Sequence, residues 1–294
     1  MSVNVVSAAK INLTLDIVGK KSNGYHDVKM IMQSVGLYEY VELTENNSGE
    51  ISVYCSNPDI PCDKSNIAVR CAKLFFDEIK KECRGLHIFI HKDIPMQAGL
   101  AGGSADGAAV LFGLNEMYKN PFSLKELEKL GERIGSDIPF CLRGGTALAQ
   151  GIGTELTSLE AMPDCWFVLV KPPIGISTAE AYAAVDTRKD KQKCATDVVL
   201  CCLDDIKKIG ENLKNDFEDA LNITELVNLK RELSECDGAL GACMTGSGST
   251  VFAIFGNESE AEECAKIFRQ KYAEVFVARP VDFGTKLSDV SYHD

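Results

Sequence analysis

Long apolar runs are missing from this 294-residue chain. No segment reaches the roughly 18 uncharged apolar residues that a membrane-spanning helix needs. The first residues also lack the basic segment and apolar core of a secretory signal. These absences exclude an integral membrane protein with helical spans, and we expect a cytoplasmic protein with no membrane partner.

An excess of basic charge is missing too, because 31 Lys and Arg face 43 Asp and Glu, for a net charge of −12. Such a chain is a poor general binder of phosphate backbones, so we expect no nucleic-acid partner. No block of like charges marks a solvated tail. With 45% hydrophobic and 25% charged residues, the composition is that of a globular protein with one large domain or two ordinary ones. Composition leaves the oligomeric state open.

The chain has 12 cysteines, yet no pair shows the CxxC spacing of zinc or redox sites. We expect reduced cysteines that pack as small apolar residues. His87 and His91 lie four residues apart, a spacing that would suit a metal site on a helix. The apolar–polar alternation of residues 86–90 predicts a strand instead, so we expect no metal held by the protein alone.

Periodicity predicts alternating strands and helices without a fixed repeat. In the first half, alternation indicates strands at 11–18, 51–55 and 86–90. Helical spacing covers 66–82, capped by Ser65 or Asn66, and a Ser-x-x-Glu capping box at Ser123 begins a helix over 123–135. In the second half we expect strands at 166–170, 251–255 and 275–278, with helices at 177–185, 196–215, 216–221, 223–236 and 258–272.

A turn-rich stretch at 147–163 suggests a boundary between two domains, at 1–158 and 159–294. The irregular alternation of elements favours an α+β fold with mixed or antiparallel sheets over a doubly wound parallel sheet.

One segment carries most of the functional information. A predicted strand at 87–91 runs into a glycine-rich loop that begins at Pro95, and an alanine-rich helix follows to about Tyr118. Backbone amides freed by small residues at a helix N-terminus form an anion site. Neither the G-x-x-x-x-G-K-[ST] nor the G-x-G-x-x-G motif fits. Glycine content alone is compatible with a structural turn as well as with a phosphate cradle, but this order of elements is more specific.

The loop resembles the phosphate loop of the GHMP kinase superfamily. Two further segments resemble one branch of it, the 4-diphosphocytidyl-2-C-methyl-D-erythritol kinases. They are A-K-I-N-L at 9–13 with N-G-Y-H at 23–26, and I-G-S-D-I-P-F at 134–140. A third segment, T-G-S-G-S at 245–249, resembles the C-terminal glycine motif of the whole superfamily. The resemblance implies a two-domain GHMP kinase fold. Its N-terminal nucleotide-binding domain is like domain 2 of ribosomal protein S5, and its C-terminal substrate-side domain is like an α/β plait.

The resemblance implies two catalytic residues, Lys10 and Asp137. Asp137 would accept the proton of the substrate hydroxyl, although an aspartate before a proline is often only a helix-end residue. Lys10 would pair with Asp137 and stabilise charge on the attacking oxygen. By itself, a lysine between two strand-like segments would be an exposed edge charge.

The resemblance also implies the binding residues. ATP would be held by Pro95, Met96, Gln97, Ala98, Gly99, Leu100, Ala101, Gly102, Gly103, Ser104 and Ala105, with Asn66 and Lys92 on the adenosine side. Many members carry serine where this chain has Ala105, so Ser104, the backbone amides or water would replace that hydroxyl. Lys92 is compatible with a strand-end charge as well.

Recognition of a cytosine base would come from a second group of side chains. Tyr25 would stack on the base, His26 would bond its edge, and Tyr182 would complete an aromatic sandwich. Thr178 and Asn12 would lie in the same pocket. The alternatives are a solvated hairpin tip, a helix cap, a packed tyrosine and a polar strand position.

The implied activity is ATP-dependent phosphorylation of the C2 hydroxyl of CDP-methylerythritol, with Mg²⁺ arriving on ATP. Two alternatives stay open. A kinase of the same superfamily for another alcohol, such as homoserine or mevalonate, would not need the base-binding group. A non-catalytic nucleotide-binding module would not need Lys10 or Asp137.

Overall fold

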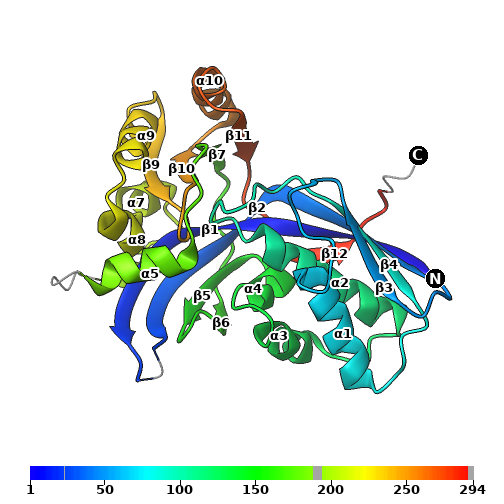
Figure 1. Ribbon diagram of the computed structural model, residues 1–294. Coiled ribbons are helices and arrows are strands. Elements are labelled where there is room, and N and C mark those ends of the chain that lie inside the picture. Colours follow the sequence, from blue (N-terminus) through cyan, green and yellow to red (C-terminus); the bar gives the residue numbers. More distant parts are fainter. Residues whose placement is uncertain (23, 188–193, 291–294) are drawn as a thin grey trace.

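Two long antiparallel strands, β1 (Ser2–Lys20) and β2 (His26–Glu45), run along the molecule and connect its two halves (Figure 1). The computed structural model of the protein describes residues 1–22, 24–187 and 194–290. Residues 5–16 of β1 are all buried, so both faces of the strand are covered. Strands covered on both faces lose the alternation of apolar and polar residues. Residues 5–10 show this loss, and the sequence predicted only 11–18 of β1 as strand. It also missed β2, although the burial of β2 alternates at both of its ends.

Eight strands of the described chain form the first sheet, with a main order of β12-β1-β2-β4-β3. Strand β5 extends it from β2, β6 from β5, and β8 from β1. The other members are β3 (Ile51–Cys55), β4 (Leu86–His91), β5 (Thr146–Gln150), β6 (Glu155–Ser158), β8 (Lys214–Asn215) and β12 (Thr285–Leu287). Most of the stretch 147–163 is therefore not a plain linker. Residues 147–158 form the β5–β6 hairpin, in which Ala147 lies opposite Ser158.

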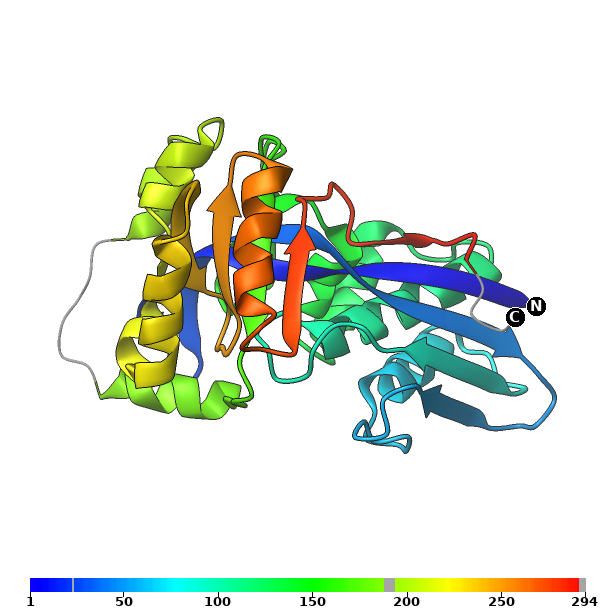
Figure 2. The same ribbon diagram turned by 90° about the horizontal axis from the view of Figure 1, so that it is seen from above.

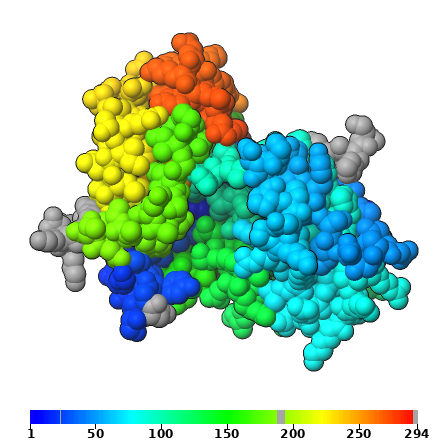
Figure 3. All heavy atoms as spheres, viewed as in Figure 1, coloured from blue at the N-terminus to red at the C-terminus, as the bar shows by residue number. Residues whose placement is uncertain are grey.

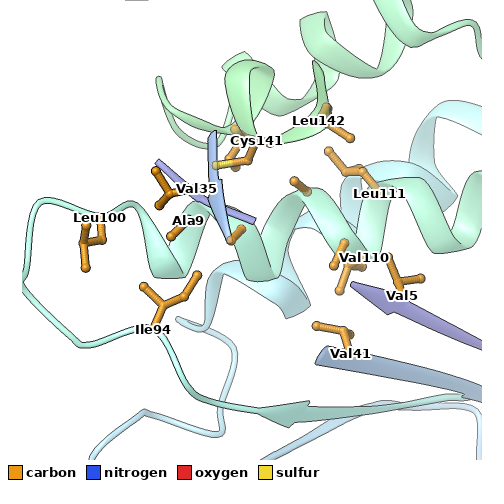
Figure 4. Packing of buried hydrophobic residues seen from close by; sticks show 14 of the residues in the cluster. Val5, Ala9, Val35, Val41, Ile94, Leu100, Val110, Leu111, Cys141 and Leu142 are labelled. Carbon is orange, nitrogen blue, oxygen red and sulfur yellow. The ribbon is translucent and has the colours of Figure 1, made fainter. Parts of the chain in front are cut away.

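Four helices accompany this sheet: α1 (Ile67–Ile79), α2 (Gly102–Met117), α3 (Leu124–Glu132) and α4 (Ile138–Arg143). Helix α2 lies at the centre of the core. Figure 4 shows Val110 and Leu111 of α2 between Val5 of β1 and Leu142 of α4. A helix buried on nearly every side must be apolar all round, which explains the alanine-rich sequence after the glycine loop.

The second sheet is antiparallel, with the order β11-β7-β10-β9, and two helices lie on one face of it (Figure 2). Its strands are β7 (Trp166–Lys171), β9 (Ala239–Met244), β10 (Val251–Phe255) and β11 (Glu274–Ala278), and its helices are α9 (Thr224–Ser234) and α10 (Glu258–Phe268). The two sheets with their flanking helices confirm the expected α+β class. The division at 158 and 159 stays a prediction, and β12 returns near the C-terminus to pair with β1.

One predicted helix is wrong. Residues 196–215 form α6 (Ala195–Leu200), a turn, α7 (Ile206–Glu211) and then β8. The carboxylate of Asp205 accepts hydrogen bonds from the backbone amides of Lys207 and Lys208, both at 3.1 Å. A side chain that caps the start of a new helix ends the preceding one.

The capping signals themselves are confirmed. Asn66 caps α1 by accepting a hydrogen bond from the amide of Ala68 at 2.9 Å. Ser123 and Glu126 form the expected capping box at α3. The remaining helices are α5 (Thr178–Asp186), which begins at a second capping box, and α8 (Asp216–Leu221).

Candidate active site

The glycine-rich loop is held between β1 and the loop 245–249 before it enters α2. Lys10 donates its backbone N–H to the carbonyl of Leu100 at 3.2 Å, and Thr250 donates to that of Ala98 at 3.2 Å. Gly99 has a φ of +74°, and a Cβ there would lie 2.1 Å from the carbonyl oxygen of Thr245. Only glycine allows this approach of the two backbones. The first amides of α2 have no acceptor within the helix, and such amides, together with the helix dipole, favour an anion at this end of the helix.

Next to this loop lies a buried cluster of three charged side chains. Lys92 forms ion pairs with Glu39 of β2 and with Asp106 of α2, at 2.9 Å in the second case. All three side chains are at most 6% exposed. Burial, and then the neighbouring Asp106, raise the pKa of Glu39 well above its ordinary value. Burial alone would lower the pKa of Lys92, but the two carboxylates outweigh it and raise that pKa.

This pairing defines the surroundings of Lys92, which the sequence offered as a contact for the adenosine side of ATP. Lys92 is one of the residues that line the cavity described below, yet the hydrogen bonds of its ammonium go to Glu39 and Asp106. Oδ1 of Asp106 is buried and has no hydrogen-bond partner in the described part of the chain. Neither carboxylate was singled out from the sequence, because their partner lies 53 and 14 residues away along the chain.

We expect Gly102→Val to raise the KM for ATP at least tenfold, which corresponds to about 1.4 kcal/mol. A Cβ at Gly102 would lie 3.0 Å from Nζ of Lys92 and 3.1 Å from Oε1 of Glu39. The branches of valine therefore disturb either the charge cluster or the approach of phosphate. Steady-state kinetics with varied ATP measure the effect. Gly256→Val is the control, because a Cβ there meets only Ile206, at 3.8 Å. An unchanged KM in a folded Gly102→Val protein would exclude the loop as the phosphate site.

Lys10 and Asn12 lie on the same face of β1 and contact the loop 245–249. The Lys10 ammonium donates to Oδ1 of Asn12 at 2.8 Å, and this oxygen also accepts from the backbone N–H of Gly246 at 3.0 Å. Both side chains are buried, at 4% and 1% exposed. Oδ1 of Asn12 therefore links the Lys10 ammonium to the loop 245–249, and it is occupied by these two protein donors.

Asp137 lies at the N-terminus of α4, a short helix that the sequence did not predict. Its side chain makes no capping hydrogen bond and is half-buried at the wall of the cavity. The predicted direct pair with Lys10 is not formed among the described residues, since the Lys10 ammonium binds Asn12. Both side chains nevertheless line the same cavity. An acceptor hydroxyl placed between them would join the base to the cation.

The cavity has a volume of about 540 Å³ and lies between the two halves of the molecule. Figure 3 shows the surface hollowed between the yellow-green side that carries α5 and the cyan side that carries α1. Every loop residue predicted to bind ATP lines it except Leu100 and Ala105, whose side chains are buried in the core. The alanine at 105 therefore removes no hydroxyl from the cavity in this arrangement.

Asn66 lines the cavity, but its side chain is engaged as a helix cap. Its oxygen accepts from Ala68, and its Nδ2 donates to the carbonyl of Pro61 at 2.7 Å. Its capping role is the simpler explanation for the asparagine at this position.

The predicted base-binding residues divide into two groups. Thr178 and Tyr182 of α5 line the cavity, and Thr178 shares a hydrogen bond of 3.2 Å with Ser247. Tyr25 is 61% exposed and does not line the cavity. His26 does not line the cavity either, because it is buried at the start of β2, where its ring stacks on that of Tyr182 with centroids 4.5 Å apart. Tyr182 thus stacks on His26, not on Tyr25 across a gap for a base. Burial, and then Asp137, raise the pKa of Tyr182 to about 12.

Asn215 is a site-supporting residue that the sequence analysis missed. Its Nδ2 donates to the carbonyls of Met244 and Gly246 at 2.7 and 2.8 Å, and its Oδ1 caps α8. The side chain therefore fixes the loop that faces Lys10. The sequence predicted this residue as the end of a helix, where such a role is not expected.

Comparisons with known proteins agree with this geometry. Family models for the GHMP kinases N-terminal and C-terminal domains match residues 66–145 and 198–274. A 4-diphosphocytidyl-2-C-methyl-D-erythritol kinase of Clostridium botulinum is 41% identical over 95% of this chain and 100% of its own length. The same-named protein of Clostridioides difficile is 39% identical over 97% of both chains. The chain belongs to the GHMP kinases, in the 4-diphosphocytidyl-2-C-methyl-D-erythritol kinase family.

Solved structures confirm the two-domain fold of this kinase. A crystal structure of 4-(cytidine 5'-diphospho)-2C-methyl-D-erythritol kinase matches with a TM-score of 0.79 and 26% identity, over 95% of this chain and 99% of the other. A homoserine kinase from Cytophaga hutchinsonii matches with a TM-score of 0.78 at 18% identity, over 98% and 97% of the chains, and shows the shared fold alone. In the described residues of this kinase, no helix is long and apolar enough to cross a membrane.

Proposed function

We propose that this kinase transfers the γ-phosphoryl group of ATP to the C2 hydroxyl of 4-diphosphocytidyl-2-C-methyl-D-erythritol, in the methylerythritol phosphate route to isoprenoids. The observation that carries the proposal is one cavity lined by three kinds of groups. The glycine loop offers a phosphate site, Lys10 and Asp137 offer a cation and a base, and Thr178 and Tyr182 line the side toward His26.

The reaction follows from these positions. The amides at the start of α2 hold the phosphates and leave the γ-phosphorus facing the cavity. Asp137 takes the proton of the C2 hydroxyl as its oxygen forms a bond to that phosphorus. The bond to the bridging oxygen breaks, and ADP leaves. The Lys10 ammonium stabilises negative charge on the attacking oxygen.

Mg²⁺ belongs to the proposal as a partner of ATP. Among the described residues, no group of three or more His, Cys, Asp or Glu side chains could hold a metal ion. Ser104 and Asp137, which line the cavity, offer oxygen atoms of the kind that Mg²⁺ prefers. The residues thus fit an ion held mainly by phosphate oxygens and water, which would neutralise charge on the phosphates.

We also propose that the kinase works in the cytoplasm. All of its cysteines are free thiols, among them the buried Cys71, Cys141 and Cys243. Burial raises the pKa of Cys71 to about 12. Free thiols used as core residues are suited to a reducing compartment.

A coupled ADP-release assay tests the function with CDP-methylerythritol, homoserine, mevalonate and galactose as acceptors. We expect turnover with the first alone.

His26→Ala should weaken binding of CDP-methylerythritol by about 1–3 kcal/mol, the worth of a specific hydrogen bond in a desolvated site. Its effect on ATP binding, followed by calorimetry, should be small. Equal weakening of both ligands would mean that His26 is structural. Turnover with homoserine or mevalonate instead would replace the proposed substrate.

A further inference from the structure

His26 is held on its face and on its edge by two residues of one helix. Tyr182 stacks on the ring with an interplanar angle of 16°. Asp186, one turn later on α5, approaches the ring edge, with its Oδ1 2.8 Å from Nε2 of His26. Positions i and i+4 of a helix share one face. The stacking and the hydrogen bond therefore come from a single rigid surface and fix the ring in one orientation.

Lys20 fixes the other oxygen of the same carboxylate. It ends β1 and lies directly opposite His26 in the β1–β2 pairing, and its Nζ is 2.5 Å from Oδ2 of Asp186. The hydrogen bond from Lys20, and then that from His26, hold the pKa of Asp186 below its ordinary value. The carboxylate is therefore ionised and can only accept hydrogen bonds.

Because the Asp186 carboxylate accepts a hydrogen bond from Nε2, it also determines whether the other ring nitrogen, Nδ1, is protonated. Nε2 must carry the hydrogen that it donates to Asp186, so in the neutral ring Nδ1 carries a lone pair. A lone pair accepts a hydrogen bond from an exocyclic amino group, which cytosine has. Uracil presents a carbonyl oxygen at the same position, and two acceptors would then face each other.

We infer that Asp186 is a positioning residue that sets the tautomer of His26 and thereby the preference for a cytosine over a uracil nucleotide. The inference rests on the proposed function, in which His26 contacts the base of the substrate. Asp186 itself touches His26 and Lys20. Neither Asp186 nor His26 is among the described residues that line the cavity, and His26 borders the cavity through the stacked ring of Tyr182, which does line it.

Asp186→Asn gives a sharper test than removal of the side chain. An amide has one acceptor and one donor end, and the Lys20 ammonium attracts the oxygen. The NH₂ group then faces Nε2, which must accept, and the hydrogen moves to Nδ1. We expect the variant to favour the other tautomer. Lys20→Met combined with Asp186→Asn removes this orientation and should give a mixture of both tautomers.

Two measurements at pH 8, where a free imidazole is neutral, follow the change. Nitrogen-15 NMR of the imidazole distinguishes protonated from unprotonated ring nitrogens. Steady-state kinetics give kcat/KM for CDP-methylerythritol and its UDP analogue. In Asp186→Asn we expect the ratio of the two to fall at least about tenfold, mainly through the KM for the nucleotide substrate, with the KM for ATP within about twofold.

Asp197→Asn is the matched control. Asp197, in the first turn of α6, likewise forms an ion pair with a lysine of the β1–β2 pair, Lys29 of β2, and among the described residues it makes no contact with His26. In Asp197→Asn, the nitrogen-15 spectrum of His26 and the CDP/UDP ratio of kcat/KM should both equal those of the unmodified protein.

The outcomes separate the inference from the proposed function. A hydrogen on Nδ1 in the unmodified protein, or an unchanged CDP/UDP ratio in Asp186→Asn, would overturn the inference. If CDP-methylerythritol is not phosphorylated at all, or if His26→Ala keeps the full base preference, the proposed reading of the base by His26 fails. In that case the role of Asp186 in base specificity is overturned as well. A nitrogen-15 spectrum that shows the hydrogen of His26 moved from Nε2 to Nδ1 in Asp186→Asn would still support the control of the tautomer by Asp186.

Discussion

Asp137→Asn should lower the turnover number by roughly 10²–10⁴, the usual contribution of a positioned general base. The substitution keeps the size of the side chain and removes its charge and its ability to accept a proton. The aspartate side chain makes no capping hydrogen bond at α4, so we expect the amide to leave the helix intact. The glycine loop is unchanged, so ATP should bind as before.

Single-turnover rates measure this effect on the chemical step, and circular dichroism confirms folding. Asp164→Asn is a suitable control, because the carboxylate of Asp164 is 93% exposed and, within the described chain, forms an ion pair with Arg279 alone. It should leave the rate unchanged. Near-normal turnover in Asp137→Asn would show that another group, or water, takes the proton of the substrate hydroxyl.

The parts of the site that the sequence predicted are those encoded in short contiguous motifs. The order of strand, proline, glycine-rich loop and helix located β4, the loop and α2, because turn and helix-start chemistry depends on neighbouring residues. The Ser123 capping box and the Asn66 cap were visible for the same reason. The family resemblance then supplied roles for Lys10 and Asp137, which both line the cavity.

The parts that the sequence did not predict depend on residues far apart in the chain. Glu39, Lys92 and Asp106 form one cluster only after β2, β4 and α2 have packed together. Asn215 reaches a carbonyl 29 residues away, and Asp186 reaches His26 across 160 residues. Burial of both faces also erased the alternation that would have identified most of β1.

The contacts of Lys10 also bear on the proposed catalytic pair of Lys10 and Asp137. A salt bridge between Lys10 and Asp137 would hold both charges in the resting enzyme and would be broken by the substrate. Instead Asn12 holds the ammonium by a hydrogen bond, and Asn12 is itself anchored to Gly246. Lys10 is therefore positioned before any substrate arrives, and preorganised charge costs no rearrangement during the reaction.

Lys10→Ala should consequently reduce the single-turnover rate by about 10²–10³, the range seen when one preorganised charge or donor is removed. Lys10→Met keeps most of the volume of the buried side chain and should give a similar loss. Agreement between the two would assign the effect to the charge, since packing differs between alanine and methionine. If methionine restores the rate, the lysine acts by filling space.

The double variant Lys10→Ala with Asp137→Asn decides whether the two residues act as a unit. Both side chains line one cavity without a direct ion pair, so the acceptor hydroxyl is the element that couples them. Once the base is lost, the charge that steadies the developing oxyanion has less to stabilise. The double variant should then be scarcely slower than the slower single variant. Rates are compared in one single-turnover assay, with unfolding midpoints as the folding check. Losses that multiply would mean that Lys10 acts on the phosphoryl group independently of proton removal, because independent contributions to the barrier add in free energy.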